Sequence, residues 1–130
     1  MSPPLNASIL LVDDDPSVRR SLVRLLRAHD YDVLDVDNVA AALDILATQR
    51  PALLLMDMVL PGEDSLDAVR GIKREARTAA VPIIAVTASP PSAPQDRALF
   101  ASILPKPSDA GALLDAIATA LRGSAGSSTA

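Results

Sequence analysis

The sequence predicts an α/β protein built on a doubly wound parallel sheet, and three observations support this. Short apolar runs alternate five times with segments whose apolar residues recur at helical spacing, a pattern typical of parallel strands joined by helices on both faces. One run, LLLM at residues 53–56, is apolar throughout and bounded by Pro51 and Pro61, as expected of a strand buried on both faces. Hydrophobic residues make up 49% of the 130 residues, which suits one domain with one core.

The first repeat begins with an apolar strand that runs into acids. The strand is predicted over Ser8–Val12, SILLV, and three aspartates at 13–15 follow directly. Asp15 is well placed to cap the next helix, because Pro16 then takes the first helical position, where its missing N–H costs nothing. This helix is expected to end between residues 28 and 30. Its apolar face is formed by Val18, Leu22, Leu25 and Leu26.

The second repeat pairs a short strand with a helix rich in alanine and leucine. The strand is predicted over Tyr31–Val36, and its acids Asp32 and Asp35 indicate a position at the edge of the sheet. Asn38 is expected to cap a helix that spans residues 39–49.

The third repeat contains the first candidate functional residue. The strand at residues 53–56 ends on Asp57, and Pro61 and Gly62 make the next segment a loop. A helix follows, marked by Leu66, Val69, Ile72 and Ala76. Open α/β sheets place their active sites at the carboxyl ends of strands, so Asp57 stands where such a site is expected.

The fourth and fifth strands are short and separated by a proline-rich stretch. A buried strand at residues 83–86 ends on Thr87. Three prolines then forbid a regular helix, leaving room for a short one over about residues 95–101. The fifth strand is predicted at Ile103–Leu104 and ends at Lys106.

The domain boundaries follow from where this pattern starts and stops. Residues 1–7 are expected to be an N-terminal tail, residues 8–122 the folded domain, and residues 123–130, GSAGSSTA, a flexible tail or linker. The domain ends with a helix that Asp109 opens. The apolar positions of this helix are Leu113, Leu114, Ile117 and Leu121.

Composition excludes several classes of protein. The net charge is −4 and there is no large basic patch, so no nucleic-acid partner is expected. Aromatic residues make up only 2%, which argues against stacking platforms for single strands. There are no cysteines, and so neither disulfides nor a thiolate metal site. Neither a membrane-spanning run nor a signal-peptide pattern is found, so a cytoplasmic protein without membrane insertion is expected.

Polar residues stand at the end of four of the five predicted strands. Because parallel strands bring their carboxyl ends to one edge, these side chains are expected to converge. They are Asp13, Asp14, Asp57, Thr87 and Lys106.

This set of side chains suits phosphoryl transfer. Carboxylates a few ångströms apart repel one another, and a cluster of three is therefore either partly protonated or holds a cation. Oxygen ligands favour Mg²⁺, which binds through carboxylates, water and phosphate oxygens. A carboxylate can attack a phosphoryl group to give an aspartyl phosphate, with Lys106 and Mg²⁺ supplying positive charge and Thr87 a hydrogen bond.

From about Ser8 to Leu121 the chain resembles the receiver domain of bacterial two-component response regulators. ILLVDDDPSVRRSL resembles the first strand, acidic pair and first helix of that family, and DMVLPGEDSL resembles the segment after its phosphorylated aspartate. VTA and PKP resemble its signature threonine and its Lys-Pro. The resemblance implies a flavodoxin-like (βα)5 fold of strand order 2-1-3-4-5, with a short or irregular fourth helix here.

The resemblance also implies a role for each site residue. Asp57 is the phosphoacceptor, Asp14 a direct Mg²⁺ ligand and Asp13 a ligand acting largely through water. The backbone carbonyl of Val59 is the third protein ligand. The Lys106–Pro107 bond is often cis in the family. The positions that contact the phosphoryl group or take part in switching are Thr87, Ala88, Lys106 and Pro107.

A receiver implies a signalling role and particular partners. The phosphoryl group comes from a histidine kinase or a histidine phosphotransfer protein, and the output runs through contacts with a downstream protein that the sequence does not name. Such a protein catalyses only its own phosphorylation and dephosphorylation.

The sequence departs from the family pattern at three places. Ser65 replaces the usual glycine after the acid of the loop, and Ile103 replaces the aromatic residue three positions before the lysine. The stretch between Thr87 and Lys106 is proline-rich, shorter than usual and without the family's Gly-Ala. The phosphorylation chemistry is expected to be intact, and the surface around the fourth helix to be altered.

These departures leave other functions open. A pseudo-receiver acting as an interaction scaffold is the main alternative, and a receiver cut from a longer chain is another. A phosphatase using an aspartyl phosphate has a second aspartate two residues after the nucleophile, where this chain has Val59. A dinucleotide-binding fold is disfavoured because the first strand-to-helix turn is acidic rather than glycine-rich.

Several charged residues are expected to have no site role. Asp15 is interpreted as a helix cap rather than a ligand, and Glu63 and Asp64 as solvated loop acids. His29, the only histidine, ends the first helix, where a cation is mildly favourable. A solvated face, which a kinase could still contact, is expected for Arg19, Arg20, Arg24 and Arg27.

Overall fold

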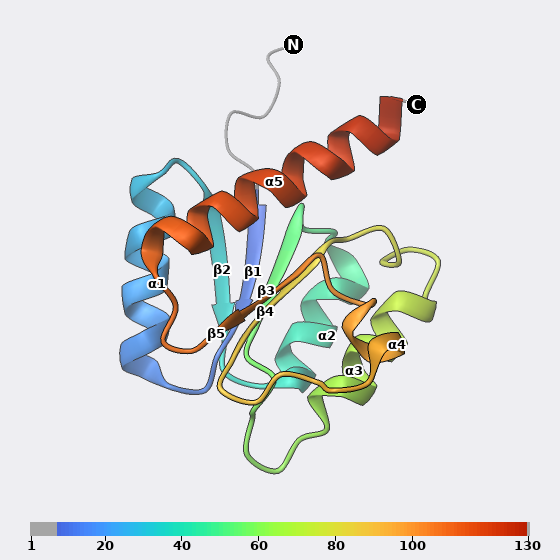
Figure 1. Cartoon of the computed structure of the whole chain (residues 1–130), viewed down its shortest axis with the longest axis horizontal. Helices are drawn as coiled ribbons and strands as arrows, with labels where there is room; N and C mark the ends of the chain where they lie inside the picture. Colours follow the sequence, from blue (N-terminus) through green and yellow to red (C-terminus); the bar gives the residue numbers. More distant parts are fainter. Residues whose placement is uncertain (1–7, 130) are drawn as a thin grey trace.

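The computed structural model describes residues 8–129, and side chains over residues 8–123. Five parallel strands form one sheet in the order β2-β1-β3-β4-β5, which confirms the predicted fold class (Figure 1). The strands are β1 Ser8–Val12, β2 Asp32–Val36, β3 Leu53–Met56, β4 Ile83–Thr87 and β5 Ser102–Pro105. The helices are α1 Pro16–Ala28, α2 Val39–Thr48, α3 Ser65–Arg74, α4 Pro94–Arg97 and α5 Ala110–Thr129.

The sheet is the middle layer of three. In Figure 1, α1 and α5 lie on one face of the sheet, and α2, α3 and α4 lie on the other. Alternate residues of β1 point to opposite faces of the sheet. Ile9 and Leu11 pack with Leu26 of α1 and Ile117 of α5, whereas Leu10 packs with α2 and α3. Both faces of the central strands are therefore buried, as the apolar run at residues 53–56 predicted.

Local signals in the sequence fix where the helices start. Asp15 caps α1, because its Oδ1 accepts hydrogen bonds from the backbone N–H groups of Ser17 and Val18. Asn38 caps α2 by accepting from the N–H of Ala41. β2 lies at the edge of the sheet, which confirms the prediction from its two acids.

Three helices end at least two residues from their predicted ends. α3 stops at Arg74, before Ala76, because the hydroxyl of Thr78 donates to the Ile72 carbonyl and closes the last turn. α4 spans only four residues, since the N–H of Ala101 already bonds to Ile83 in the sheet.

The backbone of α5 continues to Thr129, beyond the point at residue 122 where a flexible tail was expected. A helix that has formed adds one hydrogen bond per residue, and residues 123–129 contain no proline to stop it. The predicted tail at residues 1–7 lies outside the described residues. Within the described residues, no helix is long and apolar enough to cross a membrane.

Candidate functional site: an acidic cluster at the carboxyl edge of the sheet

Pairing of β1 with β3 brings the two parts of the acidic cluster together. Val12 lies in register with Met56, so the residues that follow them, Asp13 and Asp57, leave the sheet side by side. The backbone N–H of Asp57 continues the ladder by donating to the Val12 carbonyl at 2.9 Å. The parallel register alone therefore places these two aspartates next to each other.

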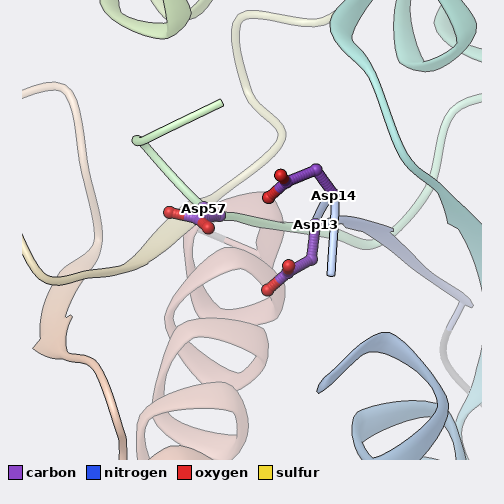
Figure 2. A group of neighbouring side chains, drawn as sticks. All are labelled: Asp13, Asp14 and Asp57. Carbon is purple, nitrogen blue, oxygen red and sulfur yellow. The ribbon is translucent and has the colours of Figure 1, made fainter. Parts of the chain in front are cut away.

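The carboxyl groups of Asp13, Asp14 and Asp57 converge. Each offers an oxygen atom, and these oxygens lie within 4.8 Å of one another (Figure 2). Asp13 and Asp57 are buried, with 3% and 5% of their surface exposed, whereas Asp14 is exposed. At an effective dielectric of about 20, two charges at this spacing repel by about 3 kcal/mol, so the cluster favours a cation.

Lys106 supplies positive charge within the protein. It follows β5, and its ammonium donates to Oδ2 of Asp57 at 2.8 Å and to Oδ2 of Asp13 at 3.0 Å. The Lys106–Pro107 peptide bond is cis, as the resemblance implied. Burial of the ammonium is the largest single influence on its pKa and lowers it, but the hydrogen bonds and charges of Asp57 and Asp13 together outweigh burial. The net effect raises the pKa of Lys106, which keeps the lysine charged and paired.

The loop after Asp57 is held at both ends. Oδ1 of Asp57 accepts from the backbone N–H of Val59 at 2.9 Å. Gly62 has a φ of 76°, and the N–H of Glu63 donates to the Leu60 carbonyl, which is a type II turn with Pro61 at its second position. The structure thus presents the Val59 side chain to solvent, half exposed, beside the candidate phosphoacceptor.

Two acids of this loop do more than the sequence suggested. Glu63 was expected to be solvated, but its Oε1 accepts from the N–H of Val39 at 2.8 Å, at the start of α2. Asp64, also assigned to solvent, caps α3 by accepting from the N–H of Asp67. For Asp64, the sequence offered a local signal, because an aspartate three residues before Asp67 can cap a helix start. For Glu63, no local signal in the sequence indicates a contact with a helix 24 residues away.

Thr87 lies beside Lys106 at the end of β4. It is 1% exposed, its Oγ1 accepts from the N–H of Ser89, and its carbonyl accepts from the N–H of Lys106. A cavity of about 250 Å³ opens next to this pair. Its lining includes Thr87, Ala88, Arg97, Ile103 and Lys106.

Ser65 stands where the family has a glycine, so it is a further departure from the family pattern. It begins α3 and is 3% exposed. Among the described side chains, its Oγ is the buried polar atom without a hydrogen-bond partner. A buried hydroxyl of this kind costs stability.

The donor set fits a hard divalent cation. All three candidate ligands are carboxylates, the groups that Mg²⁺ prefers, and the exposed face of Asp14 leaves room for water ligands. One lysine against three carboxylates leaves a net negative charge in the cluster when all are ionised. The residues present therefore suit Mg²⁺ better than an anion.

The fold and the site define a class: a doubly wound α/β domain with a lysine-linked acidic cluster at the carboxyl edge of its sheet. The chain belongs to the response regulator receiver domain family, whose family model matches residues 9–118. Receiver domains of two-component systems take part in signal transduction by phosphorylation, bind Mg²⁺ at an acidic pocket, and interact with histidine kinases or phosphotransfer proteins.

Similar proteins agree with this assignment. The chain is 36% identical over 81 residues to protein PilH of Pseudomonas aeruginosa, covering 62% of this chain and 67% of that protein. It is 33% identical over 81 residues to the phosphate regulon transcriptional regulatory protein PhoB of the same organism, where the match spans only 35% of the relative. A CheY-like receiver domain protein from Methanospirillum hungatei superposes with a TM-score of 0.83 at 20% identity, covering 94% of this chain and 98% of that one, and shows the shared fold.

Proposed function

We propose that this chain is a phosphoacceptor module of a two-component phosphorelay, phosphorylated on Asp57 by a histidine kinase or a histidine phosphotransfer protein with Mg²⁺. One observation supports this above all others: Asp57 shares an acidic cluster with Asp13 and Asp14 and is bonded to Lys106. A scaffold that is never phosphorylated has no need to bury two carboxylates against one lysine.

Each residue of the site has a role in this proposal. Asp14 and Asp57 would ligate the metal directly, Asp13 would do so largely through water, and the backbone carbonyl of Val59 would complete the protein ligands. A bound Mg²⁺ offsets the negative charge of the carboxylates and of the phosphoryl oxygens.

The chemical step forms one bond and breaks one. A carboxylate oxygen of Asp57 forms a bond to phosphorus, and the bond from phosphorus to the donor nitrogen breaks, so that the electron pair stays with the departing imidazole. Lys106, already 2.8 Å from Asp57 Oδ2, is placed to pair with the phosphoryl oxygens. The Thr87 hydroxyl accepts from the N–H of Ser89, so its own proton is free to donate a hydrogen bond to these oxygens. Ala88 and Pro107 shape the two segments that support Thr87 and Lys106.

The output is proposed to run through contacts with a downstream protein rather than with nucleic acid. The net charge of −4 disfavours a polyanion as the partner. Differential contacts of the phosphoryl group with Thr87 and Lys106 would favour a second conformation of the segment after β4.

The proposal is tested by intact mass after incubation with a small phosphodonor and Mg²⁺. The wild type should gain one phosphoryl mass, and the gain should be abolished by a chelator and by Asp57→Asn. Asp44→Asn is the matched control, because Asp44 is an exposed acid on α2, away from the cluster. It should be phosphorylated like the wild type.

Two results would contradict the proposal. If Asp57→Asn gains the same mass as the wild type, another residue is the acceptor. If the wild type gains no mass and does not bind Mg²⁺, the chain is a pseudo-receiver scaffold, and the proline-rich segment between β4 and β5 becomes the surface to study.

A further inference from the structure

Arg19 of α1 joins the acidic loop after β1 to the end of β2. Its Nε donates to Oδ2 of Asp35 at 3.0 Å, and its Nη1 donates to the backbone carbonyl of Asp13 at 2.9 Å. The sequence predicted a solvated side chain here, and for Arg19 that prediction is wrong. The planar guanidinium can donate in two directions at once, so one side chain bridges two strand ends.

The carbonyl that Arg19 binds belongs to the peptide unit between Asp13 and Asp14. The orientation of this unit determines the direction in which the next side chain leaves the backbone. Asp13 has further anchors, because its N–H donates to Val36 and its carboxylate accepts from Asp15 and Lys106. With Asp13 anchored and its carbonyl held by Arg19, the direction in which the Asp14 side chain leaves the backbone is also fixed.

Asp14 depends on this arrangement more than its neighbours do. Its carboxyl group is exposed, and within the described part of the chain no hydrogen bond to that group is found. Asp13 and Asp57, by contrast, are buried and bonded to Lys106. The backbone is therefore the main restraint on where the Asp14 carboxyl points.

We propose that Arg19, oriented by Asp35, is a positioning residue that aims Asp14 into the metal site. The inference rests on the proposed function insofar as Asp14 is taken as a direct metal ligand. Residues that orient ligands through a second layer of hydrogen bonds commonly change metal affinity by about tenfold or more.

Simple electrostatics predicts the opposite change in Mg²⁺ affinity. A guanidinium close to three carboxylates repels a divalent cation, so removing its charge should tighten metal binding. If Arg19 acts by position, its loss should instead weaken binding, and a lysine that keeps the charge should not restore it, because one ammonium cannot reproduce the two-way bridge.

Fold stability should fall only slightly. The side chains of Arg19 and Asp35 are 20% and 36% exposed, and a partly exposed ion pair contributes little to folding. A loss of metal affinity without a matching loss of stability therefore separates positioning from general damage to the fold.

The test measures the Mg²⁺ dissociation constant of the full chain by calorimetry for the wild type, Arg19→Gln, Arg19→Lys, Asp35→Ala and Arg20→Gln. Arg20 is the matched control, since it is an exposed arginine of the same helix. The dissociation constant should rise about tenfold in Arg19→Gln, Arg19→Lys and Asp35→Ala. In Arg20→Gln it should stay close to the wild type.

A second measurement needs no metal. In the metal-free protein, the NMR amide signals of Asp14 and Asp15 should shift in Arg19→Gln and Arg19→Lys, and far less in Arg20→Gln. Unchanged amide signals, or Mg²⁺ binding that stays the same or tightens in Arg19→Gln, would overturn the inference. A wild type that fails to bind Mg²⁺ contradicts the proposed function, while the amide signals still decide whether Arg19 orients the loop.

Discussion

The ammonium of Lys106 lies 2.8 Å from Oδ2 of Asp57, although 49 residues separate the two in the chain. The same nitrogen also contacts Asp13 at 3.0 Å, so it links the carboxyl ends of β1, β3 and β5. In the absence of a metal, this lysine is the counter-charge for the two buried carboxylates. If Asp57 is the phosphoacceptor, as proposed, phosphorylation must rearrange this interaction.

The ion pair of Lys106 should make stability depend on alkaline pH. The pKa of Lys106 is raised above its ordinary value of 10.5, so between 10.5 and the folded-state pKa the folded protein binds more protons than the unfolded chain. The stabilisation is complete below pH 10.5 and is lost as pH rises through the folded-state value. Without Mg²⁺, Lys106→Met should cost about 2 kcal/mol at pH 7, and the cost should shrink above pH 10.5.

Urea unfolding of the wild type and of Lys106→Met between pH 7 and pH 11.5 measures this difference. Taking the difference between the two proteins cancels the titration of groups they share. A cost that stays constant across this range would show that the lysine acts by packing rather than by charge.

Val59 should slow the loss of the phosphoryl group by hydrolysis. Its side chain is apolar, half exposed and two residues after Asp57, where it can neither orient nor activate an attacking water. Val59→Asn should shorten the half-life of the phosphorylated protein by between about twofold and tenfold, the worth of one hydrogen bond to water. Decay of phosphorylated protein followed by intact mass measures the half-life, and Val59→Ala separates the effect of size from that of hydrogen bonding.

Glu63 should stabilise the start of α2. Its carboxylate accepts from the N–H of Val39, which is otherwise one of the unpaired donors of the first helical turn. Glu63→Ala should lower the free energy of unfolding by about 1 kcal/mol, and Glu63→Gln by less, since it keeps an acceptor oxygen. Glu75 is the other glutamate of the chain, and Glu75→Gln provides the control. Equal effects at both positions in urea unfolding would argue against a cap.

The buried hydroxyl of Ser65 should lower the free energy of unfolding. Its buried Oγ finds no partner within the described part of the chain, so removing the hydroxyl should relieve the cost of its desolvation. Ser65→Ala should raise the free energy of unfolding by about 1 kcal/mol. Ser65→Gly should gain less, because glycine at a helix start adds backbone entropy to the unfolded chain. A destabilised alanine variant would show that the hydroxyl is hydrogen-bonded in solution.

The sequence was sufficient to predict the sheet and the residues that gather at its edge. Alternating apolar runs and helical segments set the strand and helix positions, and Asp15 and Asn38 marked helix starts through local capping chemistry. Asp13, Asp57 and Lys106 could be predicted to lie together because parallel strands end at one edge of the sheet, and the structure brings them together there.

The sequence did not predict the hydrogen bonds that the side chains of Glu63 and Arg19 make. Glu63 with Val39, and Arg19 with Asp13 and Asp35, depend on the angle at which loops leave the sheet, which no periodicity records. The ends of α3 and α5 were also missed, since a helix stops where tertiary contacts or a breaker stop it, and apolar spacing alone does not reveal that.

The shortness of α4 has a consequence for how easily the protein can change shape. A helix of four residues has a single turn, and its tie to α3 is one ion pair between Arg70 and Asp96, whose arginine is 42% exposed. Because none of the residues of α4 is buried, opening its single turn breaks few main-chain hydrogen bonds and costs little free energy compared with global unfolding, whereas Leu99 and Phe100, which follow it, pack against the core. If Asp57 is phosphorylated as proposed, a phosphoryl contact at Thr87 needs only a modest energy to shift the conformation of this turn.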